Sequence, residues 1–361
     1  MRSPAAVRSR RVWLAIAITS VAVVASACLP PPPDGAPTDP VLVNVGRTGN
    51  RPIDFPDPSI MKTGDTFYGY STGGPGGTVQ VIKSTDLVHW SWVGDAFVGP
   101  TVYAAAQTGS TWAILRSSTW APSVIERPAN DPSQRFVLYY SAKSVLPGSA
   151  GMWCIGRATS AKPEGPFVDE RNTPILCQPE RGGSIDPKVM VADDGQVYLV
   201  SQSFGIAATG EPTRIWSTLL TNDGLSVALW PFEILASQWD TFETPVIESP
   251  TMMPAPGGGY LLFYSAGQWW LDNYKVAVAW CATPLAPCER IYSGPLLTSR
   301  GAMAGPGGED VFQDASGNWW MVFHAWAAPY VGYVFGDTRY ARMMRLLPIT
   351  FPDGTHNPKV G

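Results

Sequence analysis

Residues 57–61 read DPSIM, and similar phrases recur along the chain with a changing first residue. The related phrases are APSVI (121–125), DPKVM (186–190), SPTMM (249–253) and, less closely, GPGGEDVF (305–312). They begin about 55–65 residues apart, a spacing typical of repeat architectures. Each is followed by an aromatic stretch rich in strand-forming residues, such as FYGYST (67–72) or YLLFYSA (260–266). The chain is therefore predicted to repeat one β-rich unit five times.

Each unit reads as an antiparallel meander of short strands separated by Gly or Asp turns, such as KTGDT (62–66) and VADDGQ (191–196). One unit of this size cannot bury both faces of its sheet alone, whereas five units arranged radially can. Helical patterning is scarce. The predicted fold class is therefore all-β: a five-bladed β-propeller with blades of short antiparallel strands around a central channel. A long β-sandwich is the alternative.

The repeated proline indicates where each blade begins, because proline has no N–H and is tolerated at the first residue of a strand. If that strand is the innermost of its blade, the residue before proline lies at the mouth of the channel. The five equivalent blade-start residues are Asp57, Ala121, Asp186, Ser249 and Gly305, and Glu248 precedes the fourth. Three blades should therefore bring an acid to one rim. Asp54 lies outside the repeated phrase and is expected to cap a turn.

The composition excludes some classes of function. The chain has 361 residues and a net charge of −4, and 15% of its residues are charged. No basic stripe indicates a nucleic-acid partner. The 36 Gly and 35 Pro residues are dispersed among apolar segments, as in a folded protein with many turns.

Residues 1–27 resemble a signal peptide, with an arginine-rich start, the apolar run VWLAIAITSVAVV (12–24) and the small residues ASA (25–27). The apolar run is shorter than a typical membrane span. Cys28 follows directly, and ASAC is similar to the lipobox of bacterial lipoproteins, in which the cysteine is lipidated; plain secretion is the alternative. Residues 28–48 contain LPPPPDGAPTDP and are predicted to form a stiff tether. The folded domain is expected over residues 49–361.

Five cysteines are an odd number for an exported chain, and a lipidated Cys28 would leave four. Four cysteines allow three pairings. Pairing of Cys154 with Cys177 and of Cys281 with Cys288 is expected, because each pair flanks a stretch that reads as one hairpin unit. An oxidising compartment permits both disulfides. None of these cysteines has the spacing of a zinc site.

Three carboxylates that converge on one pocket suggest glycoside hydrolysis by a general acid and a general base. One acid protonates the leaving oxygen, and an ionised carboxylate activates water. A third negative charge raises the pKa of the acid and holds its orientation. Glu243 is a rival of Glu248, but it does not occupy the repeated phrase. Asp-Pro is also a common turn dipeptide, so a turn role is the alternative for Asp57 and Asp186.

In these phrases the chain resembles glycoside hydrolase family 43, whose catalytic domain is a five-bladed β-propeller. The matching motifs are Asp57-Pro58-Ser59, Trp120-Ala121-Pro122, Ile185-Asp186-Pro187 and Glu248-Ser249-Pro250. Each tripeptide alone is common, but their order, with one in each blade, is specific. The resemblance covers about residues 50–355.

The resemblance implies a role for each motif residue. Asp57 resembles the general base that activates water, Glu248 the general acid, and Asp186 the residue that raises the pKa of the acid and orients it. The family inverts configuration, so base and acid are expected roughly 6.5–9.5 Å apart. Residues expected to contact the sugar are Trp120, Ile185, His324, Arg342 and Arg345. Alternation along a strand would place the two arginines on opposite faces.

One departure from the family pattern concerns the fifth blade. Many family members have Gly-Pro-Gly-His there, whereas Gly308 stands at the His position in this chain. Glu309 and Asp310 are weak candidates for calcium ligands, because both offer hard oxygen atoms; solvent-facing residues at the start of a strand are the alternative. The expected chemistry requires no cofactor. The segment QWWLDNY (268–274) is a candidate loop at the rim of the pocket.

The expected function is that of an inverting glycoside hydrolase acting on plant-type or cell-wall polysaccharide. The phrases CIGRATSAKPEGPFVD (154–169) and AVAWCATPLAPCE (277–289) resemble arabinofuranosidase members, so release of terminal α-L-arabinofuranosyl residues is expected. The alternatives are a β-xylosidase, a galactofuranosidase, a non-catalytic sugar-binding propeller and a protein-binding propeller. We expect a monomer that is exported from a bacterial cell and contacts a membrane only through a lipid on Cys28.

Overall fold

The computed structural model describes residues 41–42, 44–46, 53–74, 77–97, 111–127, 131–352 and 354–361. The expected signal peptide, Cys28 and most of the expected tether lie outside the described residues. Within the described part of the chain, no helix has the length and apolar character to cross a membrane. Its helical structure comprises the short 3-10 helices η2 (Pro132–Gln134), η3 (Pro179–Arg181) and η4 (Ala207–Thr209).

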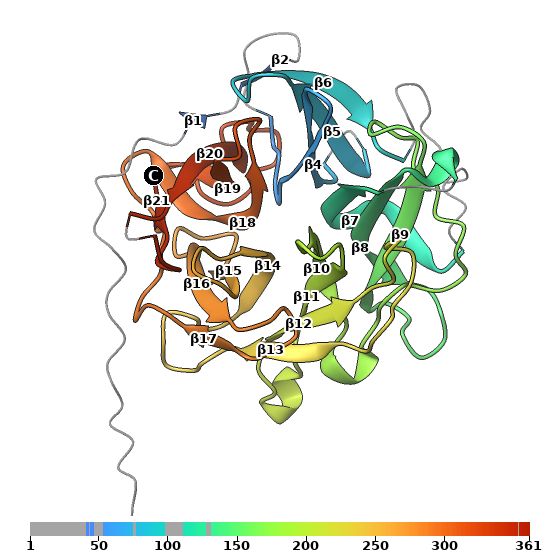
Figure 1. Ribbon diagram of the computed structural model, residues 1–361. Helices are drawn as coiled ribbons and strands as arrows, with labels where there is room; N and C mark the ends of the chain where they lie inside the picture. Colours follow the sequence, from blue (N-terminus) through green and yellow to red (C-terminus); the bar gives the residue numbers. More distant parts are fainter. Residues whose placement is uncertain are drawn as a thin grey trace, which may run out of the picture.

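The strands form five sheets arranged as a ring around a central channel (Figure 1). Blade 1 contains β2 (Asn44–Gly46), β3 (Ser59–Thr63), β4 (Thr66–Thr72), β5 (Val79–Ser84) and β6 (His89–Asp95). Blade 2 contains β7 (Ala113–Glu126), β8 (Phe136–Ser144) and β9 (Trp153–Ser160). Blade 3 contains β10 (Ile185–Val191), β11 (Val197–Ser203), β12 (Arg214–Leu219) and β13 (Phe232–Ala236).

Blade 4 contains β14 (Ile247–Pro254), β15 (Tyr260–Ala266), β16 (Lys275–Cys281) and β17 (Cys288–Arg290). Blade 5 contains β18 (Met303–Gln313), β19 (Trp319–Ala327) and β20 (Met343–Thr350), joined by β1 (Val41–Leu42) and β21 (Lys359–Val360). The prediction of an all-β, five-bladed propeller is confirmed.

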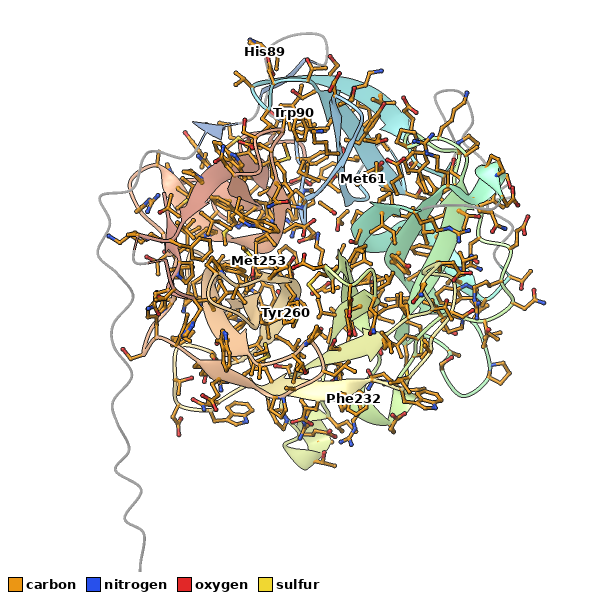
Figure 2. All side chains as sticks on the ribbon, viewed as in Figure 1. Met61, His89, Trp90, Phe232, Met253 and Tyr260 are labelled. Atoms are coloured by element: carbon orange, nitrogen blue, oxygen red, sulfur yellow. A yellow bond between two sulfur atoms is a disulfide. The ribbon has the colours of Figure 1, made fainter. Side chains whose placement is uncertain are left out.

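Buried apolar clusters fill the spaces between neighbouring blades and follow from the alternation of side chains along each strand. In β8, Leu138 and Tyr140 pack against blade 1, whereas Val137 and Tyr139 pack against blade 3. The same alternation continues at the outer edge, where Trp90 is buried next to the exposed His89 (Figure 2). Clusters of this kind join blades 3 and 4, 4 and 5, and 5 and 1 as well. Each blade therefore has both faces covered, which no single blade achieves alone.

Two strands near the N-terminus differ from the expectation for residues 28–48. β1 pairs with β20 and so adds a strand to the last blade, and β2 pairs with β6 of blade 1. The sequence VLVNVG (41–46) is rich in valine, which favours a strand over a proline-stiffened tether. Val41–Leu42 and Asn44–Gly46, which the predicted tether included, therefore pair with strands of the propeller.

The five blade-start residues share one unusual backbone conformation. The dihedral φ is 50° at Asp57, 44° at Ala121, 54° at Asp186, 51° at Ser249 and 57° at Gly305. L-residues rarely adopt this left-handed region. The pairing register also shifts at four of these five points, for example between Ile185 and Lys188, and such bulges re-aim side chains. The sequence repeat is thus also a repeat of backbone geometry at the channel.

Both expected disulfides are present. Cys154 of β9 is bonded to Cys177, and Cys281 of β16 is bonded to Cys288 of β17. The second pair joins two residues that face each other across neighbouring strands. The prediction of two local pairings is confirmed.

Candidate active site

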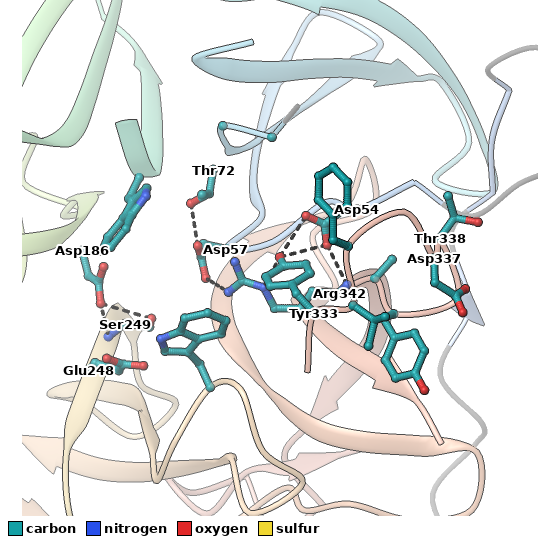
Figure 3. A pocket seen from close by; sticks show the side chains of 18 of the residues that line it. Asp54, Asp57, Thr72, Asp186, Glu248, Ser249, Tyr333, Asp337, Thr338 and Arg342 are labelled. Atoms are coloured by element: carbon teal, nitrogen blue, oxygen red, sulfur yellow. Dashed lines mark hydrogen bonds and ion pairs between the residues drawn. The ribbon is translucent and has the colours of Figure 1, made fainter. Parts of the chain in front are cut away.

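A cavity of about 760 Å³ is lined by three of the five blade-start residues, Asp57, Asp186 and Ser249. Its lining includes six of the predicted site residues, namely Asp57, Trp120, Ile185, Asp186, Glu248 and Arg342. Figure 3 shows Asp57 between Thr72 and Arg342, with Asp186, Ser249 and Glu248 on the facing side. Residues from four blades, and Arg342 directly before β20 of the fifth, therefore meet in one pocket.

Asp57 is surrounded by groups that favour its ionised form. Thr72 Oγ1 donates a hydrogen bond to Asp57 Oδ2 at 2.5 Å, and Arg342 Nη1 lies 3.4 Å from Oδ1. Burial alone would raise the pKa of Asp57, but the charge of Arg342, with smaller effects from Thr72 and Lys188, holds it below the ordinary 3.8. Asp57 is therefore a carboxylate at neutral pH.

His324 lies beneath Asp57 and does not line the cavity. Its Nδ1 accepts a hydrogen bond from Asp57 N at 3.0 Å, which places the ring proton of the neutral form on Nε2. Burial, and then the charge of Arg342, lower the pKa of His324 to about 3. The imidazole is therefore neutral at pH 7 and acts on Asp57 through this hydrogen bond rather than through a charge.

Asp186 is held by the next blade and by the preceding one. Its Oδ2 accepts hydrogen bonds from Ser249 N at 2.9 Å and Ser249 Oγ at 3.3 Å. Its own N donates to Ser141 Oγ at 3.0 Å. Burial, and then the negative charge of Asp57, raise the pKa of Asp186 to about 7.

Glu248 precedes the fourth blade-start residue and accepts a hydrogen bond from Tyr274 OH at 2.7 Å. Burial, and then the charge of Asp186, raise the pKa of Glu248 to about 8. The pKa values of both acids are raised, so the pair holds a proton to higher pH than a free carboxyl group would. The pocket thus holds an ionised carboxylate on one side and a protonated carboxyl group on the other.

Arg342 is fixed in place by an acid that the sequence pattern did not single out. Asp54 accepts hydrogen bonds from Arg342 N at 2.7 Å and from Tyr333 OH at 2.9 Å. Tyr333 OH in turn accepts from Arg342 Nε at 2.9 Å, and the guanidinium lies 4.6 Å from the ring centroid of Trp269. The expectation that Asp54 caps a turn is wrong, because its carboxylate reaches across to the last blade.

Aromatic side chains supply much of the remaining lining. Trp120 is 37% exposed and stacks on Trp153, with ring centroids 3.7 Å apart. Trp269 lines the cavity and lies in the segment predicted to form a rim loop. Phe204 and Phe335 also line it, and nothing in the repeated phrase pointed to either. Flat apolar faces of this kind suit the packing of sugar rings.

Two other predicted or rival residues lie away from the cavity. Arg345 is on β20, is buried, and does not line the pocket, whereas Arg342 directly precedes that strand and does line it. Glu243 is fully buried and accepts hydrogen bonds from Arg290 Nε at 2.6 Å, Tyr264 OH at 2.7 Å and Gln238 N at 2.8 Å. These contacts use its carboxylate oxygens, so Glu243 ties blade 4 together and leaves the pocket to Glu248.

The two calcium candidates have other partners. Asp310 accepts hydrogen bonds from Ser59 Oγ at 2.7 Å and Thr251 Oγ1 at 2.9 Å. Glu309 accepts from Ser265 Oγ at 2.5 Å, and burial raises the pKa of Glu309 to about 8. Among the described residues, no group of three or more His, Cys, Asp or Glu side chains is arranged to hold a metal ion. The contacts support structural roles for both acids.

Comparisons with known proteins agree with this geometry. Residues 50–356 match the family model described as glycosyl hydrolases family 43. The chain is 33% identical over 171 residues to an extracellular endo-α-(1→5)-L-arabinanase of Thermotoga petrophila, covering 41% of this chain and 33% of that protein. It is 29% identical over 165 residues to an extracellular exo-α-(1→5)-L-arabinofuranosidase of Cellvibrio japonicus, covering 43% and 42% of the two chains. The matches therefore span less than half of these relatives.

A solved structure is similar over a larger part of the chain. The crystal structure of an endo-1,4-β-xylanase from Bacteroides thetaiotaomicron is 27% identical, with a TM-score of 0.67 over 86% of this chain and 95% of that one. The fold is therefore shared with a solved structure over most of both chains.

Proposed function

Because the chain belongs to glycosyl hydrolases family 43, we propose that it is an inverting glycoside hydrolase whose substrate sugar occupies the cavity over the blade-start residues. One observation carries the proposal: Asp57 is held ionised and Glu248 is held protonated, and both line the same cavity. A general base and a general acid need these opposite states at the same pH.

In the proposed reaction, Asp57 takes a proton from a water molecule that attacks the anomeric carbon. Glu248 donates its proton to the glycosidic oxygen as the bond to the leaving sugar breaks. Asp186 keeps the pKa of Glu248 high and orients the acid through its neighbour Ser249. Arg342, fixed by Asp54 and Tyr333, keeps the charge of Asp57 in place and faces the sugar.

We propose terminal α-L-arabinofuranosyl residues of arabinan or arabinoxylan as the substrate. The support comes from the relatives, one named an arabinanase and one an arabinofuranosidase. A β-xylosidase activity is the second candidate, because the similar solved structure carries the name of a xylanase. The aromatic lining of the pocket fits either sugar.

A panel of aryl glycosides tests this function. We expect hydrolysis of 4-nitrophenyl α-L-arabinofuranoside to exceed that of the β-D-xyloside and the β-D-galactofuranoside, and arabinose to be released from arabinan. Proton NMR of the first product should show the anomer opposite to that of the substrate. If no glycoside is turned over while oligosaccharides bind tightly, the protein is a sugar-binding propeller. If the anomer is retained, the assignment of Asp57 as a base is wrong.

We propose that the chain is exported and that Cys28 carries a lipid. The support is the signal-like segment 1–27 and the word extracellular in the names of two relatives. Mass spectrometry of the mature N-terminus tests this: a diacylglyceryl group on Cys28 is expected, and an unmodified Cys28 would contradict it. We also propose a monomer, and size-exclusion chromatography with light scattering should give one chain per particle.

A further inference from the structure

Lys188 is a buried lysine that the proposed reaction does not use. It lies on β10, two residues after Asp186, and is 2% exposed. Its Nζ donates hydrogen bonds to the carbonyl oxygens of Pro58 at 3.0 Å and Pro122 at 3.4 Å. It also lies 3.7 Å from Asp310 Oδ2. Burial of an ammonium group is unfavourable unless the group is paired and hydrogen-bonded, so this arrangement requires an explanation.

The pair formed by Lys188 and Asp310 contacts the start of every blade. Lys188 belongs to blade 3 and reaches the prolines that open blades 1 and 2. Asp310 belongs to blade 5 and accepts hydrogen bonds from Ser59 of blade 1 and Thr251 of blade 4. One ion pair therefore joins the five innermost segments below the cavity.

We propose that Lys188 is a positioning residue that, paired with Asp310, holds the five blade starts together and places a fixed positive charge beneath Asp57. The Pro58 carbonyl that Lys188 binds follows Asp57 directly in the chain. Thr72, His324 and Arg342 hold the Asp57 side chain and N–H from other directions. Lys188 adds a fourth contact, through the carbonyl group of the following residue Pro58. The inference rests on the proposed role of Asp57 as the base.

The charged groups around the site determine the sign of the expected effect. Asp57 faces the cation Arg342, the neutral imidazole of His324, and the acids Asp54, Asp186 and Glu248. Lys188 faces Asp310, and its charge lowers the pKa of Asp57, Asp186 and Glu309. Loss of the Lys188 charge should therefore raise the pKa of Asp57. Loss of the Asp310 charge leaves the positive charge of Lys188 without its negative partner, so it should lower the pKa of Asp57.

The experiment compares Lys188→Met with Asp310→Asn in the full domain. Lys62→Met is the matched control, because Lys62 is exposed on β3 and its ammonium donates a hydrogen bond to the nearby Gly64 O. Two readouts are used: titration of the Asp57 carboxyl by ¹³C NMR, assigned with Asp57→Asn, and the pH profile of kcat/KM on the best aryl glycoside. The NMR readout does not depend on activity.

We expect Lys188→Met to move the Asp57 titration and the acidic limb of the profile to higher pH. We also expect kcat to fall about tenfold or more with little change in KM, because displaced reacting groups lower kcat. Asp310→Asn should move the titration to lower pH, and Lys62→Met should leave both readouts unchanged. A purely structural pair would lower the unfolding temperature in both variants without these opposite shifts.

The proposal fails if Lys188→Met leaves the Asp57 titration in place and kcat within twofold of the wild type. If Lys188→Met does not fold, Asp310→Asn decides alone: a titration moved to lower pH supports the proposal, and an unchanged one overturns it. An inactive wild-type protein would instead refute the proposed function, while the NMR titration would still report on Lys188.

Discussion

The two sides of the pocket shift the pKa of a carboxyl group in opposite directions. Asp57 and Asp186 both begin a blade, and their φ values are 50° and 54°. Asp57 faces Arg342 and keeps a pKa below its ordinary value, whereas Asp186 and its neighbour Glu248 face other acids and have raised pKa values. The repeated backbone therefore sets where an acid is placed, and the non-repeated neighbours decide whether it is ionised.

The largest expected effect is that of Asp57→Asn. An amide cannot accept a proton from water, so kcat should fall by about 10²–10⁴-fold. The loss should be similar for every leaving group, because water activation is needed in each case. Steady-state kinetics on aryl arabinofuranosides with different leaving groups would measure this. A loss that depends on the leaving group would argue that Asp57 is not the base.

Glu248→Gln tests the facing side of the pocket. Hydrolysis of natural arabinan should fall about 10²–10³-fold, because the leaving sugar needs a proton. Hydrolysis of 2,4-dinitrophenyl glycosides should fall much less, because that leaving group departs without one. The ratio of the two losses is the measurement. Equal losses on both substrates would show that Glu248 does not act as the general acid.

Glu243→Gln separates the buried rival from the acid of the pocket. Removing the charge leaves Arg290 without its carboxylate partner, and breaking such a buried pair destabilises a fold by about 3 kcal/mol. Urea denaturation should show this loss, whereas kcat measured well below the new melting temperature should stay within a few fold of the wild type. Arg290→Met is the matched variant. A selective loss of kcat in a stable Glu243→Gln protein would show instead that Glu243 takes part in catalysis.

The smallest expected effect is that of Tyr274→Phe. The tyrosine hydroxyl donates to the ionised form of Glu248 and so lowers its pKa. Without that hydrogen bond the pKa of Glu248 rises above about 8. Activity needs Glu248 protonated, so the basic limb of the kcat/KM profile should move to higher pH, while the acidic limb, set by Asp57, stays in place. A shift of the basic limb to lower pH would contradict the assignment.

The sequence alone predicts most of the fold, because five repeats carry the same pattern. Alternation in stretches such as FVLYYSA (136–142) predicts strands. The proline after Asp57 or Asp186 predicts the start of β3 and β10 to within two residues, whereas β7 already begins at Ala113, well before Pro122. The expected tether wrongly included the strands β1 and β2. Strands of two or three residues are too short to show a recognisable alternation, and a run of prolines lies nearby.

The sequence marks the three candidate catalytic acids, because each stands in or directly before a repeated phrase, but it does not mark their neighbours. Thr72 and Tyr274 donate hydrogen bonds to Asp57 and Glu248 from other segments of the same blade, and Thr72 also accepts one from Ala121 N of blade 2. Tyr333 belongs to the segment between β19 and β20, where no repeat marks a position. Lys188 lies inside the repeated phrase DPKVM, yet only the ring geometry shows that five blade starts meet at its ammonium group and at Asp310. Contacts at the centre of the ring form only when the five blades close around it, so no local sequence pattern predicts them.

The pairing of β1 with β20 has a consequence for the order of events in time. Val41 lies opposite Leu346, so the last blade is complete only when the two ends of the propeller meet. Asp57 and Arg342 are 285 residues apart in the chain. As a chain emerges from the ribosome or crosses a membrane, Asp57 appears near the beginning and its guanidinium partner near the end. Arg342, whose positive charge helps to keep Asp57 ionised, therefore emerges only when nearly the whole chain has been made. A chain that ends before Arg342 would keep the three acids but would lack this positive charge.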